Sequence, residues 1–82
     1  MKSDIKIKDL IQIWSYESLS YRIFEVYDIY YSEYGGYVYE CFRIKLEGKD
    51  NFKRETFTYL IHHKDVVAKF SPINKIDIKN EN

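Results

Sequence analysis

Two adjacent glycines, Gly35 and Gly36, constrain the fold of this chain more than any other feature. They separate two runs rich in Ile, Val, Phe and Tyr, at residues 21–31 and 37–47. Such residues favour strands, and glycine supplies the positive φ angles that a tight hairpin requires. The segment 32–36 is therefore predicted to be the turn of a β-hairpin.

The run 37–47 alternates most regularly, because Phe42 and Ile44 point one way while Arg43 and Lys45 point the other. A second turn is expected at 47–51, and a third strand at 52–61. The run 21–31 is predicted to be a strand with a bulge near Phe24–Glu25. Its polar residues recur every three positions, which leaves a helix open there.

A helix is predicted over residues 4–15, because Ile7, Leu10, Ile11 and Trp14 form one stripe at helical spacing. Residues 62–70 fit one helical turn or an irregular connection, and a last short strand is expected around Ile73, Ile76 and Ile78. The fold class is therefore α+β: a three- to four-stranded antiparallel meander with one N-terminal helix. The pattern leaves open whether the sheet stays open or closes into a small barrel.

The length of 82 residues allows one small domain, predicted at 1–78, with a frayed polar tail at 79–82. Thirteen basic and thirteen acidic residues cancel, which excludes a strongly basic nucleic-acid module and a strongly acidic DNA mimic. No run is apolar enough for a signal peptide or a membrane-spanning helix. With the single thiol, Cys41, this indicates a cytoplasmic protein that does not contact a membrane.

Catalytic patterns are sparse in this sequence. His62 and His63 are adjacent and would point to opposite faces of a strand, although His63 with Asp65 leaves a metal site as the less favoured alternative. Cys41 is expected to be a buried apolar residue rather than a thiolate paired with a histidine. The chain has no phosphate loop or nucleophile elbow. We therefore expect no catalytic residues, no metal and no cofactor, and hence no enzyme.

Tyrosines and carboxylates concentrate around the predicted hairpin. Residues 1–40 hold four basic and seven acidic residues, and eight of the nine tyrosines lie between residues 16 and 40. Tyrosine tolerates exposure and is enriched at the energetic centres of interfaces. AT-rich codon bias is the alternative explanation for the excess of tyrosine. The predicted partner-binding residues are Tyr30, Tyr31, Glu33, Tyr34, Tyr37, Tyr39 and Glu40.

The basic half of the chain supports a different function. Cations beside aromatic residues on a sheet are typical of platforms for single-stranded nucleic acid. The residues predicted for this alternative are Arg43, Lys45, Lys53 and Arg54, with Tyr37 and Tyr39 on the same face as Arg43.

The favoured hypothesis is a small, non-enzymatic interaction protein. Its tyrosine- and acid-rich hairpin would bind and occlude a partner protein with a basic surface. Small size and AT-rich composition suggest an inhibitor or accessory protein of a mobile element. Unpaired strand edges would also allow self-association.

Overall fold

The chain forms a single β-sheet in the computed structural model, which describes residues 4–48, 51–72 and 78–80. The strands are β1 (Leu10–Ser15), β2 (Ser20–Ser32), β3 (Gly36–Leu46), β4 (Phe52–His62), β5 (Val66–Phe70) and β6 (Ile78–Asn80). Their order in the sheet is β5-β1-β2-β3-β4-β6, and only the pairing of β4 with β6 is parallel. The predicted α+β class is therefore wrong, and the sheet is open rather than a closed barrel, with β5 and β6 as its edges.

The predicted helix over 4–15 is replaced by a turn and a strand. The Asp9 carboxylate accepts a hydrogen bond from the Lys6 amide at 2.9 Å, and Lys8 has a φ of 77°, so the chain turns before β1 begins. Ile11 in β1 pairs with Phe24 in β2 and with Lys69 in β5. Because β1 has a strand on each side, its backbone N–H and C=O groups find hydrogen-bond partners. The stability gained from this pairing exceeds the local preference of residues 4–15 for a helix.

The three central strands lie where the sequence predicts them, and residues 21–31 belong to a strand rather than a helix. Ser32 pairs with Gly36 across the hairpin turn. Gly36 takes a left-handed φ of 73°, whereas Gly35 does not use a positive φ. The Ser32 hydroxyl completes the turn by accepting the amide of Tyr34 at 3.3 Å.

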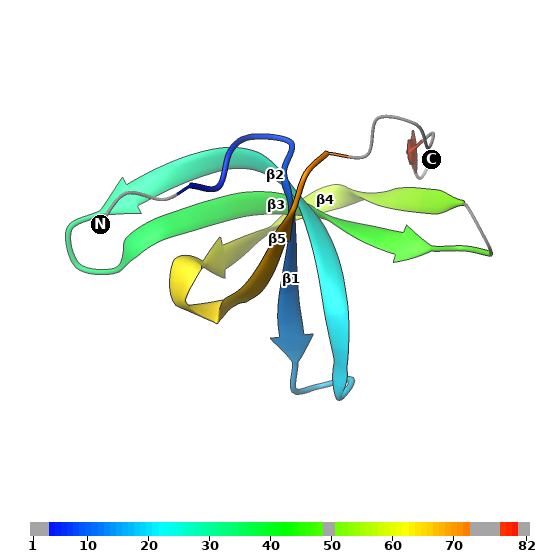
Figure 1. The fold of residues 1–82 in the computed structure, drawn as a ribbon, viewed down its shortest axis with the longest axis horizontal. Coiled ribbons are helices and arrows are strands. Elements are labelled where there is room, and N and C mark those ends of the chain that lie inside the picture. The colour runs from blue at the N-terminus through cyan, green and yellow to red at the C-terminus, as the bar shows by residue number, and fades with distance from the viewer. Residues whose placement is uncertain (1–3, 49–50, 73–77, 81–82) are drawn as a thin grey trace.

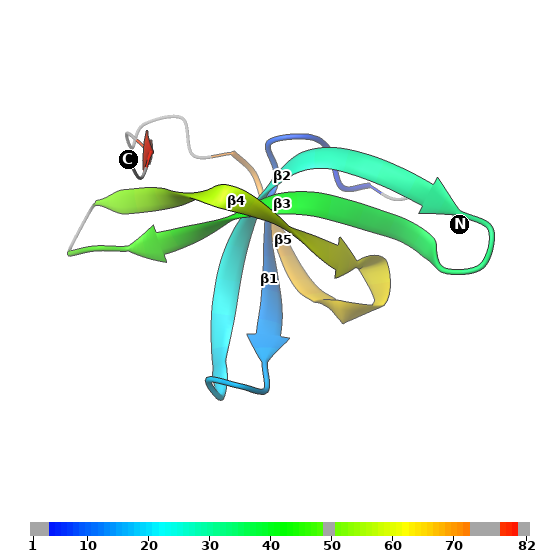
Figure 2. The ribbon, with the colours of Figure 1, turned by 180° about the vertical axis from the view of Figure 1, so that it is seen from behind.

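A β-bulge occurs in β2, two residues beyond the predicted position at Phe24–Glu25. The register shifts between Val26, which pairs with Cys41, and Asp28, which pairs with Glu40, so Tyr27 is the extra residue. A second irregularity lies between Phe42 and Ile44 in the pairing of β3 with β4. Bulges bend strands and increase their twist. Figures 1 and 2 show the result: the β1–β2, β2–β3 and β3–β4 hairpins extend from the middle of the sheet in three different directions.

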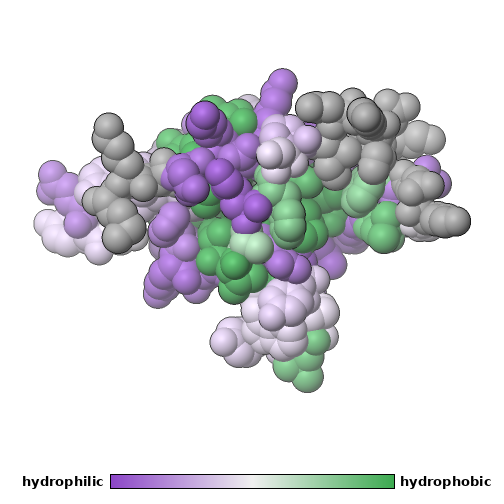
Figure 3. Space-filling view, in the orientation of Figure 1, coloured by the Kyte–Doolittle hydropathy of each residue, from purple (hydrophilic) through white to green (hydrophobic). Residues whose placement is uncertain are grey.

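The core covers one face of this bent sheet, which we call the inner face. Its buried members come from five segments of the chain and are Ile5, Ile11, Phe24, Val26, Tyr39, Cys41 and Ile61. Full burial of a side chain such as Ile11 contributes roughly 1.5–3 kcal/mol to folding. The opposite, outer face exposes large side chains among charged ones. Seen in the orientation of Figure 1, the molecular surface has apolar residues next to strongly polar ones (Figure 3).

The C-terminal part combines a short 3-10 turn with two strands. His63–Asp65 form the turn η1, and β5 follows it directly. Ile73 and Ile76 of the predicted last strand lie outside the described residues. Ile78 begins β6, and Lys79 and Asn80, which the sequence places in a polar tail, pair with β4. None of the described segments is a helix with the length and apolarity needed to span a membrane.

Candidate protein-interaction surface

Strand alternation divides the predicted hairpin surface between the two faces of the sheet. Tyr31 and Tyr37 pair directly on the inner face, with ring centroids 5.1 Å apart. Tyr30 and Glu40 lie on the outer face, where the Tyr30 hydroxyl donates a hydrogen bond to Glu40 Oε1 at 2.8 Å. Tyr34 is 100% exposed at the turn, next to the exposed Glu33. These residues therefore do not form one continuous surface.

Tyr39 lies in the core rather than on a surface, since it is 0% exposed. Its hydroxyl is 2.7 Å from Nδ1 of His63, which satisfies a buried polar group. Tyr39 is therefore not available to a partner in this fold. The His63 ring also lies 6.4 Å from Tyr37, so the histidine packs over the inner tyrosines.

The Cys41 thiol is buried beside these residues. Burial and, secondarily, the charge of Glu40 raise the pKa of Cys41 to about 12. The thiolate, which is the nucleophilic form, is therefore disfavoured at physiological pH. Within the described residues, no three His, Cys, Asp or Glu side chains come close enough together to hold a metal ion.

Two carboxylates stand directly opposite each other on the outer face. Asp28 in β2 pairs with Glu40 in β3, at the position where the bulge ends. Glu40 is held by two donors, Tyr30 at Oε1 and the Thr58 hydroxyl at Oε2, at 2.8 and 2.9 Å. Neither carboxylate forms an ion pair with a basic side chain of the described residues. Like charges directly opposite across two strands destabilise a sheet, so the chain maintains an unfavourable arrangement here.

The electrostatic effect of these carboxylates is visible in Tyr30. The hydrogen bond to Glu40, followed by desolvation and the charge of Asp28, raises the pKa of Tyr30 to about 12. The Tyr30 phenol therefore remains protonated at physiological pH. It serves as a fixed donor that orients the Glu40 carboxylate.

Aromatic and apolar side chains surround the two carboxylates. Tyr27 is 55% exposed and packs edge-on against Phe42, with ring centroids 5.2 Å apart. Leu60, which pairs with Glu40 from β4, is 66% exposed. We call this surface the acidic tyrosine face and define it as Tyr27, Asp28, Tyr30, Glu40, Phe42, Thr58 and Leu60. The sequence prediction included only Tyr30 and Glu40 of this set.

A neighbouring pair on the same face is already neutralised. The Arg54 guanidinium lies 2.7 Å from the Glu25 carboxylate and 5.6 Å from the centroid of the Phe42 ring. This arrangement joins a cation, a carboxylate and an aromatic ring. It marks one boundary of the acidic tyrosine face.

The predicted basic residues do not form one cationic surface. Arg54 lies on the outer face with Glu25, while Lys45 pairs with Glu55 at 3.3 Å and Lys53 pairs with Glu47 at 3.6 Å. Arg43 lies on the inner face, next to Phe24 in the pairing of β2 with β3. Arg22, which sequence reasoning missed, lines the same hollow as Arg43 and Lys45. Arg22 lies two residues before Phe24 in β2, so strand alternation places both on the inner face, and the sequence alone could have shown this.

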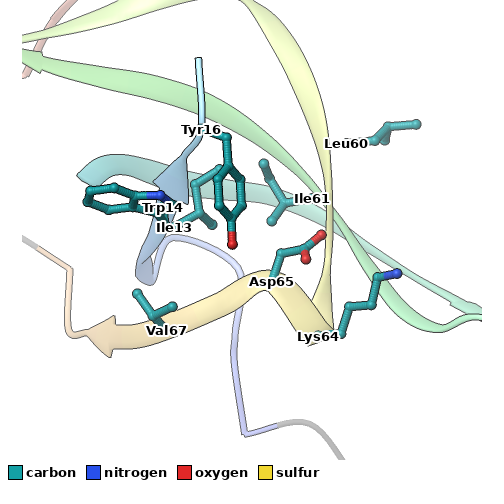
Figure 4. Close-up of a pocket in the computed structure, with 8 residues that line it drawn as sticks. All are labelled: Ile13, Trp14, Tyr16, Leu60, Ile61, Lys64, Asp65 and Val67. Atoms are coloured by element: carbon teal, nitrogen blue, oxygen red, sulfur yellow. The ribbon is translucent and has the colours of Figure 1, made fainter. Parts of the chain in front are cut away.

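A different hollow, of about 430 Å³, opens between β1, β4, η1 and β5. Figure 4 shows the rings of Trp14 and Tyr16 on one side of it and the Lys64 and Asp65 side chains on the other. Its lining is about equally polar and apolar, and its two charged residues are adjacent in sequence and opposite in sign. None of the described residues that line it is a serine, cysteine or histidine.

Comparisons with known proteins assign no family to this chain. No family model, no curated protein and no solved structure matches it.

Proposed function

We propose that this protein is a small, non-enzymatic interaction protein that binds and occludes a basic segment of a partner protein. The acidic tyrosine face is the proposed contact surface. The observation that supports it most directly is the opposition of Asp28 and Glu40 without a cation from the described residues. A lysine or arginine from a partner would relieve this repulsion on binding.

The Glu25–Arg54 pair indicates the chemistry that such a partner would bring. Arg54 places its guanidinium on a carboxylate and over an aromatic ring at the same time. Asp28 and Glu40 stand beside Tyr27 and Tyr30, but no basic side chain of the described residues forms an ion pair with them. An arginine of the partner fits this chemistry best, because its planar guanidinium both pairs with carboxylates and stacks on rings.

Exposed aromatic residues support the same proposal. Tyr27 and Tyr30 are 55% and 47% exposed, although both carry large apolar rings. Tyrosine supplies contact area at a low entropy cost, which suits an interface. A groove of about 420 Å³ between Ile7 and Tyr27 adjoins the face and would take an apolar side chain next to the partner's cation.

The other predicted contact residues lie apart from the acidic tyrosine face. Tyr31, Glu33, Tyr34 and Tyr37 lie at or near the hairpin turn, and they would extend the contact only if the partner wraps around its tip. An inhibitory or accessory role in a mobile element rests on size and composition alone.

The proposal is tested with labelled peptides of about ten residues, in which arginine alternates with leucine, measured by fluorescence polarisation. Asp28→Asn and Glu40→Gln are each expected to weaken binding by about tenfold. Glu17→Gln is the matched control, because it removes the same charge from an exposed residue in the turn between β1 and β2, away from the face. We expect the control to change the affinity by less than about twofold, and a peptide with glutamate in place of arginine to show no binding.

Two results would contradict the proposal. One is an arginine peptide that binds the wild type and the two face variants equally. The other is a pull-down from native host extract, with nuclease treatment, that recovers the same proteins with wild type and with the double variant Asp28→Asn/Glu40→Gln. Circular dichroism of each variant shows whether a loss of binding reflects a loss of fold.

A further inference from the structure

Two arms of the sheet separate at the end opposite the hairpin turn of β2 and β3. The pairing of β2 with β3 starts at Ile23 and Ile44, so Tyr21 and Arg22 pair only with β1 and Lys45 pairs only with β4. Figure 1 shows the β1–β2 arm and the β3–β4 arm diverging from this point. A hollow of about 460 Å³ lies between them, and we call it the notch.

Positive charge gathers in the notch without full neutralisation. Arg22, Arg43 and Lys45 line it, and the buried carboxylate of Glu55 pairs with Lys45 at 3.3 Å. Arg22 and Arg43 form no ion pair and no hydrogen bond with any described residue. The Nε atom of Arg22 is buried and has no acceptor in the part of the chain that the structure describes. An unsatisfied buried donor carries an energetic cost, and the cost is greater for a charged group.

The guanidinium groups of Arg22 and Arg43 both influence the same residue, Tyr59. Both Arg43 and Arg22 lower the pKa of Tyr59 and so oppose the larger effects of burial and of the Glu55 hydrogen bond, which together raise it. The Tyr59 hydroxyl donates that bond to Glu55 at 3.1 Å. Glu55 is therefore already engaged by Tyr59 and Lys45, and the two arginines remain for an external anion.

Aromatic rings complete the notch. Tyr21 is 59% exposed, and its ring packs edge-on against Trp14 with centroids 4.9 Å apart, which fixes its orientation. Phe52 lines the notch from the β4 side. By alternation, Tyr21 and Phe52 lie on the outer side of the notch, and Arg22 and Arg43 lie on its inner side. A ligand that contacts both sets therefore passes through the gap between the two arms. Aromatic rings stack nucleobases, and guanidinium groups match the geometry of phosphate oxygens. The volume of the notch lies within the range of small-molecule sites.

We infer that the notch binds a nucleotide unit, with its phosphate on Arg22 and Arg43 and its base on Tyr21 or Phe52. This site does not involve the acidic tyrosine face, so a test of nucleotide binding is independent of a test of the proposed partner binding. A free nucleotide and a single strand of nucleic acid share this chemistry. The two sources are separated by testing thymidine monophosphate and an oligothymidylate of about eight nucleotides.

Trp14 provides the readout, because it is the only tryptophan and contacts Tyr21. We expect either probe to change its fluorescence in a saturable way. Arg22→Gln and Arg43→Gln are each expected to weaken binding by about tenfold and to reduce the salt slope of the affinity by about one. Lys64→Gln is the matched control: it removes the same charge from an exposed residue of η1, and its expected effect is below about twofold.

The outcomes separate cleanly. Binding of the oligonucleotide alone, lost in both arginine variants, supports a site for single strands, and equal affinity for the mononucleotide supports a site for free nucleotides. Absence of binding to both probes at about 1 mM, or equal binding by Arg22→Gln, Arg43→Gln and Lys64→Gln, would overturn the inference. If Arg22→Gln does not fold, Arg22→Lys is used instead. It keeps the positive charge but removes the planar guanidinium with its paired donors, and it must still weaken binding.

Discussion

The outer face carries two pairs of charged groups that differ in one respect. Glu25 and Arg54 neutralise each other beside Phe42, whereas Asp28 and Glu40 place two negative charges at paired positions beside Tyr27 and Tyr30. Both pairs lie across strands of the same sheet and next to aromatic rings. The first pair is an ion pair. The second holds two like charges at paired positions, offset by hydrogen bonds to Glu40 from Tyr30 and Thr58 and to Asp28 from the Ile29 amide. Like charges held together at a surface are typical of a binding site for the opposite charge.

The largest effect is expected from breaking the neutralised pair. Arg54→Met leaves Glu25, whose side chain is 14% exposed, without its cation, and should lower the free energy of unfolding by about 2 kcal/mol. Urea unfolding measures this change. Lys69→Met is the control, because its partner Asp4 is 83% exposed and the expected loss is below about 0.5 kcal/mol. Equal losses in the two variants would show that Glu25–Arg54 contributes no more than a surface pair.

A smaller effect is expected from adding a cation next to Asp28 and Glu40, as Arg54 provides one for Glu25. Leu60 lies directly opposite Glu40, so Leu60→Arg supplies the missing cation and should raise the free energy of unfolding by about 0.5 kcal/mol. The same variant should reduce binding of the arginine peptide by at least about tenfold, because the chain's own guanidinium now occupies the site. Leu60→Gln controls for the loss of the apolar side chain. If Leu60→Arg is less stable than Leu60→Gln, the result would contradict a repulsion between Asp28 and Glu40.

The smallest effect is expected from the Tyr30 phenol. Its pKa is raised from 10.0 to about 12 in the folded protein, so the phenol stabilises the fold below pH 10 and this contribution is lost as the pH rises towards 12. The difference in unfolding free energy between wild type and Tyr30→Phe should therefore be constant from neutral pH to about pH 9 and then shrink. Unfolding curves at increasing pH measure it, and Tyr34→Phe at the exposed turn serves as the control. A difference that does not change with pH would contradict the hydrogen bond to Glu40.

Local sequence features predicted the centre of the fold well. The glycine pair and the alternating runs around it correctly placed β2, β3, β4 and the hairpin turn. The same reasoning failed at residues 10–15, because a stripe of apolar residues fits a helix and a strand equally well when both faces of the strand are buried. Leu10 and Ile11 are buried on opposite faces of β1, which period-two alternation does not reveal.

The candidate surface was predicted only in part, for a related reason. The sequence prediction grouped Tyr30 and Tyr31 on one surface, although successive strand residues point to opposite faces. In addition, the extra residue at Tyr27 changes which side chains share a face beyond it. A bulge leaves no clear mark in a sequence rich in tyrosine and isoleucine. The opposition of Asp28 and Glu40 therefore emerges only when the register is known.

The sequence by itself determined that the chain forms hairpins around Gly36, that its charges cancel, and that tyrosines and acids gather near the turn. These are properties of neighbouring residues, set by backbone preferences and composition. Only the tertiary structure decided that residues 10–15 form a strand, that Tyr39 lies in the core, and that Asp28 meets Glu40. Each of these depends on strands that are distant in sequence, and their pairing energy exceeds the local preferences that a sequence displays.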